Sequence, residues 1–208
     1  MLIIHNIAEL CTGPRGPVRL DGAGLVRRYR NASVGIDDGR IAWIKENDGE
    51  SPPAGANVID ARGGCVIPGL IDCHTHTVFA GSREGEFVQR IEGRSYAEIA
   101  AAGGGIRNSM SAVRAATLDE LVELALPRLA RMLAWGVTTV EVKSGYGLTP
   151  ADELKMLRAI KACGSRQPIE CVATYLAAHT VPPEFDGDPD GYLDAILAYD
   201  VLERIKNE

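Results

Sequence analysis

Histidine and cysteine are scarce in this chain. Its 208 residues hold only four histidines, and its five cysteines include no CxxC pair. An odd number of cysteines without that spacing argues against a disulfide framework and favours reduced thiols. We therefore expect a cytoplasmic protein.

Three further absences limit the partners. No apolar run reaches the roughly 20 residues that a membrane span requires. The N-terminal run MLIIHNIAEL has no basic segment ahead of it, so we expect no secretory signal. Acidic residues outnumber basic ones by 28 to 22, whereas a nucleic-acid surface normally carries a basic stripe. We expect neither a membrane nor a nucleic acid as partner.

The composition is that of an ordinary globular protein, and the chain changes character along its length. Hydrophobic residues make up 46% and charged residues 24% of it. Residues 1–64 have the pattern of strands and turns. The runs ASVGI and RIAWI flank Asp37-Asp38-Gly39, which predicts a hairpin because glycine tolerates the positive φ of such turns.

Helical spacing begins at about residue 95. Thr117 to Glu120 forms a capping-box pattern ahead of apolar residues at helical spacing, and Pro127 inside that pattern predicts a kink or a break. Thr149-Pro150 opens another helix, which Gly164 is expected to end. The apolar runs VTTVEV and IECVATYLAA read as buried strands. This alternation predicts an α/β fold with parallel strands.

Two of the four histidines lie in Asp72-Cys73-His74-Thr75-His76, after the apolar run Gly69-Leu70-Ile71 that we expect to lead into a buried strand. Residues two apart on a strand point to the same face, so both imidazoles are expected to project together. Two neutral imidazoles can bind zinc, iron or nickel. An isolated HxH pattern is a weak signal and is more often structural or incidental.

The segment VIPGLIDCHTHTVFAG resembles the first-strand motif of the amidohydrolase superfamily. The segments HTHTVFAGSREGEF, AAGGGI, VEVKSGYGL and TYLAAHTVPPEF together resemble the imidazolonepropionases within that superfamily. The resemblance covers roughly residues 1–190. It implies a (β/α)₈ TIM-like barrel, here incomplete, preceded by part of a small β-sandwich. Residues 1–64 would belong to the sandwich, and residues 65–208 would form the first strand–helix units of the barrel.

The resemblance also implies a reaction. Family members hydrolyse 4-imidazolone-5-propanoate to N-formimidoyl-L-glutamate in L-histidine degradation, using a water activated by one metal ion, Zn or Fe. His74 and His76 match metal ligands of the family. Arg83, Tyr146 and His179 match substrate-binding residues. The full-length family is compatible with a homodimer.

Each match has a structural alternative. Arg83 beside Glu84 and Glu86 could form a surface ion pair, Tyr146 between two glycines could cap a turn, and a lone histidine such as His179 is often structural. Tyr96 is a further candidate contact. Lys143, on an expected strand, is assigned a polar structural role.

The length raises two other expectations. A full barrel takes about 250 residues, and the family's remaining metal ligands come from later strands. No histidine follows His179, and GYLDAILAYDVLERIKNE departs from the family pattern. We expect a truncation or a frameshift, with little activity in the chain alone. The alternatives are another amidohydrolase or aminohydrolase acting on a nucleobase-like ring, and an inactive metal-binding fragment.

Overall fold

The computed structural model describes residues 1–13, 26–46, 49 and 51–207. The chain divides into two compact units, Met1–Pro68 and Gly69–Glu208. Each unit has its own hydrophobic core, and all residues that the sequence singles out for chemistry lie in the second unit.

The first unit is a five-stranded mixed sheet. Its strands are β1 (Leu2–Thr12), β2 (Arg27–Asp37), β3 (Arg40–Lys45), β4 (Asn57–Asp60) and β5 (Cys65–Val66). β1 and β3 flank β2 in antiparallel pairs, and β4 and β5 both run parallel to β1. The predicted hairpin is confirmed: Asp38 and Gly39, with φ of +47° and +70°, form the turn between β2 and β3.

The second unit alternates helices and strands. Its strands are β6 (Leu70–Thr75), β7 (Val137–Lys143) and β8 (Glu170–Thr174). Its helices are α1 (Glu84–Ile91), α2 (Tyr96–Ala101), α3 (Ile106–Ala115), α4 (Leu118–Ala134), α5 (Pro150–Arg166), α6 (Pro189–Ile196) and α7 (Tyr199–Lys206). Two short 3₁₀ turns, Ala177–His179 and Pro183–Phe185, follow β8.

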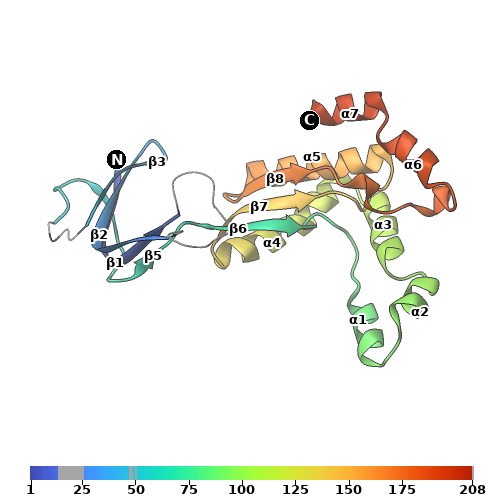
Figure 1. The fold of residues 1–208 in the computed structure, drawn as a ribbon, viewed down its shortest axis with the longest axis horizontal. Coiled ribbons are helices and arrows are strands. Elements are labelled where there is room, and N and C mark those ends of the chain that lie inside the picture. The colour runs from blue at the N-terminus through green and yellow to red at the C-terminus, as the bar shows by residue number, and fades with distance from the viewer. Residues whose placement is uncertain (14–25, 47–48, 50, 208) are drawn as a thin grey trace. The chain divides into compact units, whose positions relative to one another are not determined.

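The three strands of this unit form a parallel sheet in the order β6-β7-β8, and α4 and α5 pack against it (Figure 1). The expected α/β architecture with parallel strands is therefore confirmed. Its core joins the sheet to the two helices through fully buried side chains such as Leu129, Val140 and Ile160. The carboxyl ends of β6, β7 and β8 share one edge of the sheet, where the chemically interesting side chains follow.

Both predicted helix starts are confirmed. Thr117 and Glu120 form a reciprocal capping box, with the Thr117 amide donating to Glu120 Oε2 at 2.8 Å and the Glu120 amide donating to Thr117 Oγ1 at 3.2 Å. At the start of α5, Thr149 Oγ1 accepts from the Asp152 amide at 3.1 Å, with Pro150 in the first turn. These bonds satisfy amides that have no partner within the helix.

The predicted helix end at Gly164 is wrong, and of the kink or break predicted at Pro127 the break is wrong. α4 runs unbroken through Pro127, which lies on its exposed side, where a carbonyl that loses its amide partner can bind water. α5 continues past Gly164 to Arg166. Its end is set instead by Gln167, whose side-chain amide donates to the carbonyl of Cys163 at 3.2 Å and to that of Ile169 at 2.9 Å.

The expected burial of β6 and β8 is also wrong. Ile71 in β6 is 70% exposed and Val172 in β8 is 47% exposed. Of the three strands in this sheet, β7 alone has a strand on both sides, and its Val140 and Val142 are buried. The last predicted strand ends at Thr174, where the chain turns into the 3₁₀ turn that carries His179.

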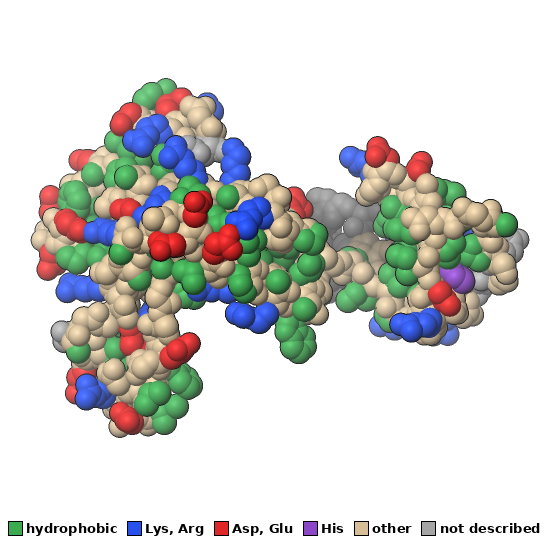
Figure 2. Space-filling view, turned by 180° about the vertical axis from the view of Figure 1, so that it is seen from behind, with side chains coloured by type: hydrophobic (Ala, Val, Ile, Leu, Met, Phe, Trp, Pro, Cys, Tyr) green, Lys and Arg blue, Asp and Glu red, His purple; other side chains and the backbone are tan. Residues whose placement is uncertain are grey.

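The helices α1 and α3 were not predicted by the sequence pattern. α1 buries none of its residues, and its Phe87 and Ile91 are 66% and 72% exposed. Figure 2 shows hydrophobic, acidic and basic side chains interspersed on the visible face of the second unit. Among the described helices, none is both long and apolar enough to span a membrane.

Candidate active site

The end of β6 places two imidazoles near each other. The ring centroids of His74 and His76 lie 6.1 Å apart. Thr75, between them, donates from Oγ1 to the carbonyl of Glu141 on β7 at 2.8 Å, and Thr77 donates to Thr75 Oγ1 at 2.9 Å. These bonds fix the backbone on both sides of His76 to the central strand.

His76 is the centre of a cluster of rings. Tyr146, from the loop after β7, stacks on it with centroids 4.7 Å apart and planes at 21°. His179, from the 3₁₀ turn after β8, lies with its ring centroid 6.0 Å from that of His76 and 6.4 Å from that of Tyr146. The structure thus brings together side chains that follow three successive parallel strands.

The loop that carries Tyr146 passes very close to His179. Gly145 has a φ of +105°, and a Cβ placed on it would lie 2.8 Å from both His179 Cε1 and the carbonyl oxygen of Leu176. Only glycine fits this position, because a side chain would meet a backbone oxygen as well as the imidazole. The Leu176 carbonyl also lies 2.9 Å from His179 Nδ1. Since a carbonyl can only accept, Nδ1 carries the proton of this bond and Nε2 is the acceptor of the neutral ring.

Burial shifts the pKa of both His76 and Tyr146, and like charge acts on His76 as well. Burial lowers the pKa of His76, and the neighbouring His179 and His74 lower it further. Burial also raises the pKa of Tyr146. At neutral pH, His76 is therefore an uncharged imidazole and Tyr146 a protonated phenol that can donate a hydrogen bond.

In the metal-free chain we expect His76 to titrate below the value of about 6.5 found in unfolded peptides. The folded state then favours the neutral ring. This contribution to stability is present above the unfolded pKa and is lost as the pH falls through the folded pKa. Titrating the ring protons by NMR measures it, with Tyr146→Ala as the comparison. A midpoint at or above the unfolded value would contradict the burial of this ring.

A cavity of about 520 Å³ opens beside His76 and Tyr146, within the roughly 300–1,000 Å³ typical of small-molecule sites. Its lining comprises His76, Phe79, Ala80, Gly81, Ser82, Arg83, Glu84, Asn108, Ser109, Arg128, Arg131 and Tyr146. Arg83 therefore shares a cavity with His76 and Tyr146. His74 and His179 do not line this cavity, but their rings lie near that of His76.

Arg83 is held by an acidic neighbour. Its Nε donates to Glu86 Oε2 at 2.8 Å, and the other carboxylate oxygen of Glu86 accepts from the Gly105 amide at 3.0 Å. Burial opposes ionisation of Glu86, but the hydrogen bonds from Arg83 and Gly105 outweigh it and hold its pKa below the usual value. The ion pair that the sequence offered as the structural alternative thus exists, and it uses Nε, not the terminal guanidinium nitrogens.

Two other singled-out residues lie outside this cavity. Tyr96 is 63% exposed, with its hydroxyl near Gly105. Lys143 forms an ion pair with Glu141, whose carboxylate also accepts from Thr174 Oγ1 at 2.6 Å. This bonding ties β7 to β8 and accounts for Lys143 as a structural cation.

The pattern of the sequence did not indicate Arg128 and Arg131. They lie three residues apart on α4, a spacing that places two side chains on one helix face. Arg128 donates to the carbonyls of Thr77 and Phe79 at 3.0 and 2.8 Å. It therefore fixes the segment between His76 and Arg83.

The donor atoms are compatible with a metal ion. Nδ1 of His76 is buried without a hydrogen-bond partner, and a neutral imidazole is the form that binds a metal. Within the described part of the chain, no group of three or more His, Cys, Asp or Glu side chains could hold one. His74 and His76 supply two imidazoles, whereas a catalytic zinc site uses three protein ligands.

The chain was compared with protein families, curated proteins and solved structures. No protein-family model matches the chain. An imidazolonepropionase of Ectopseudomonas mendocina is 52% identical over 175 residues, which are 83% of this chain and 43% of that protein. One of Myxococcus xanthus is 48% identical over 210 residues, covering 100% of this chain and 49% of that protein. The chain is similar to imidazolonepropionases over most of its length. It spans about half the length of the curated relatives it matches.

Solved structures show the fold. Escherichia coli guanine deaminase superposes with a TM-score of 0.61 at 17% identity, over 93% of this chain and 43% of that one. A triazine hydrolase from Arthobacter aurescens gives 0.59 at 23% identity, over 84% of this chain and 35% of that one. At these identities the likeness concerns the architecture alone.

Proposed function

We propose that this chain supplies the imidazolone-binding side of an imidazolonepropionase site, which hydrolyses 4-imidazolone-5-propanoate to N-formimidoyl-L-glutamate. The observation that carries the proposal is the placement of Arg83, Tyr146 and His76 around one cavity in a relative of enzymes of that name. This substrate has the two features that such a cavity can recognise, a flat polar ring and a carboxylate.

Each side chain has a role in that proposal. Arg83 binds the propionate carboxylate, for which a planar guanidinium is well suited. Tyr146 donates a hydrogen bond from its protonated phenol, and His179 accepts one at Nε2 from a ring N–H. His74 and His76 hold the metal ion, Zn or Fe, which when bound polarises the carbonyl and acidifies water.

The overall reaction consumes one water. Its oxygen bonds to the ring carbonyl carbon, the ring C–N bond breaks, and the released nitrogen takes a proton. The ring cluster contributes by orienting the substrate. Holding the reacting atoms in place removes part of the entropic cost of the step.

The arrangement of the strands supports the same proposal. β6, β7 and β8 are parallel, and the segments after their carboxyl ends carry His76, Tyr146 and His179. We interpret them as the first three strands of a (β/α)₈ barrel, in which active sites lie at that end. The first unit would form part of a small β-sandwich, and full-length members would be homodimers. The five free cysteines support a cytoplasmic location.

A chimera tests the function directly. In it, this chain replaces the matched half of the Myxococcus xanthus relative. We expect the chimera to convert the imidazolone to formimidoylglutamate, detected by mass spectrometry, with turnover on the order of 10 per second. A folded chimera that is inactive beside an active parent would refute the proposal. Deamination of a neutral nucleobase in preference to the imidazolone would favour the aminohydrolase alternative.

A further inference from the structure

The loop that presents Tyr146 is organised around a buried carboxylate. Glu153, in the first turn of α5, has no exposed surface. Its Oε2 accepts from the Gly145 amide, and its Oε1 accepts from the amides of Gly147 and Leu148, all at 2.8 Å. Three amides of one loop therefore converge on one side chain, an arrangement that favours an anion.

The bonding makes Glu153 an acceptor at both oxygens. A carboxylate fits three N–H donors, whereas an amide side chain would turn its own NH₂ group towards one of them. Burying a carboxylate is costly, and a well-packed apolar residue is often no less stabilising at such a position. The carboxylate is therefore better explained by the loop conformation that it enforces than by stability alone.

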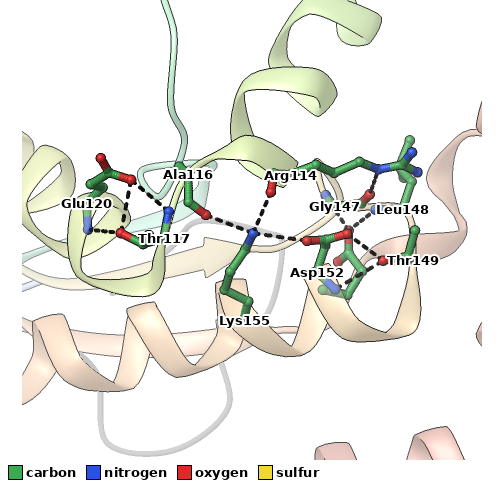
Figure 3. Close-up of polar contacts among 10 residues, drawn as sticks. Arg114, Ala116, Thr117, Glu120, Gly147, Leu148, Thr149, Asp152 and Lys155 are labelled. Atoms are coloured by element: carbon green, nitrogen blue, oxygen red, sulfur yellow. Dashed lines mark hydrogen bonds and ion pairs between the residues drawn. The ribbon is translucent and has the colours of Figure 1, made fainter.

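Further bonds extend from the same loop. Arg114 on α3 donates from Nε to the Gly147 carbonyl at 2.8 Å, as Figure 3 shows beside Leu148. The Ser144 hydroxyl accepts from the Leu176 amide at 3.1 Å. The loop is thus fixed to α3 and to the segment that carries His179.

We propose that Glu153 is a positioning residue that sets the stack of Tyr146 on His76. Tyr146 lies between the bonded amides of Gly145 and Gly147, so its backbone is held on both sides. This backbone places the Tyr146 ring on His76, with the ring centroids 4.7 Å apart, where both side chains line the cavity. Glu153 acts through the loop and does not line the cavity with Arg83 and His76.

This inference deepens the proposed function, on which its consequence for substrate binding rests. The test measures the stacking of Tyr146 on His76 in the absence of substrate. In NMR spectra of the 208-residue chain, the ring protons of His76 feel the ring current of stacked Tyr146, and Tyr146→Ala defines their positions without the stack. We expect Glu153→Gln to move the His76 signals towards those positions and to shift the amide signals of Gly145, Gly147 and Leu148.

Two controls separate positioning from loss of stability. Leu129→Ala removes a buried side chain from the core below the sheet and should lower stability while leaving the His76 signals in place. Glu123→Gln, on exposed α4 surface paired with Arg166, should change neither. Glu153→Gln is preferred to Glu153→Ala as the test variant because the Glu and Gln side chains have the same shape, so the variant is better able to fold.

The outcomes are distinct. Unmoved His76 signals in Glu153→Gln, or equal movement in Leu129→Ala, would overturn the positioning role. If the His76 signals respond as expected but the chimera is inactive, the proposed function fails while the positioning role stands. In an active chimera, Glu153→Gln should raise KM more than it lowers kcat, and Tyr146→Ala in addition should cause little further change.

Discussion

His76→Ala is expected to abolish metal retention and to lower kcat/KM of the chimera by more than about 100-fold, the upper end of the loss from removing a group that only supports a metal ligand. His76 is the one ring that joins the cavity, the His74 pair and the Tyr146 stack. Removing it takes away a metal donor and one wall of the site. Metal content by mass spectrometry and steady-state kinetics measure the two losses.

Two other histidines provide controls for this prediction. His5→Ala, in β1 of the first unit, should change neither metal content nor kinetics. His179→Ala should leave the metal in place and raise KM, because its Nδ1 bonds to the Leu176 carbonyl and the role proposed for it is substrate binding. Metal retention in His76→Ala at the wild-type level would remove the basis for the assigned ligands.

Arg83→Ala is expected to cost about 1.5–3 kcal/mol of substrate binding, the usual contribution of a hydrogen bond to a charged group. That corresponds to roughly 10- to 150-fold in kcat/KM. Arg83→Lys should recover only part of the loss, because an ammonium lacks the planar, two-pronged geometry of guanidinium. Steady-state kinetics on the chimera give both values.

The substrate itself supplies the decisive comparison for Arg83. With the propionate replaced by its neutral amide, wild type and Arg83→Ala should have similar kcat/KM. Arg90→Ala, on the exposed face of α1, should resemble wild type with either substrate. Equal losses on charged and neutral substrates would mean that Arg83 supports the cavity through Glu86 and does not recognise the carboxylate.

Much of the second unit follows from local signals. The capping box at Thr117, the proline after Thr149 and the apolar run after Gly136 each act over a few residues, and the structure confirms the elements they predict. The end of α5 did not follow from Gly164, because Gln167 binds the Cys163 carbonyl in the last turn from outside the helix. Such a bond depends on where the next strand lies.

Some residues of the candidate site could likewise be predicted from the sequence, and others could not. The spacing of His74 and His76 indicated a shared direction, and the resemblance to imidazolonepropionases indicated Arg83, Tyr146 and His179. Glu153 was missed although the sequence contains a signal for it. It stands four residues before Leu157 and seven before Ile160, on the apolar face of its helix, where a carboxylate requires dedicated partners. Those partners are loop amides, which leave no trace in the sequence.

Ligand titration of the 208-residue chain with Zn²⁺ and 3-(imidazol-4-yl)propanoate, followed through the histidine ring signals, tests most directly whether these groups form one site for a carboxylated ring. We predict saturable shifts of His76 and His179, weakened by Arg83→Ala, with His5 in the first unit unaffected. Unchanged His76 and His179 signals, or a response that His5 shares, would contradict the assignment.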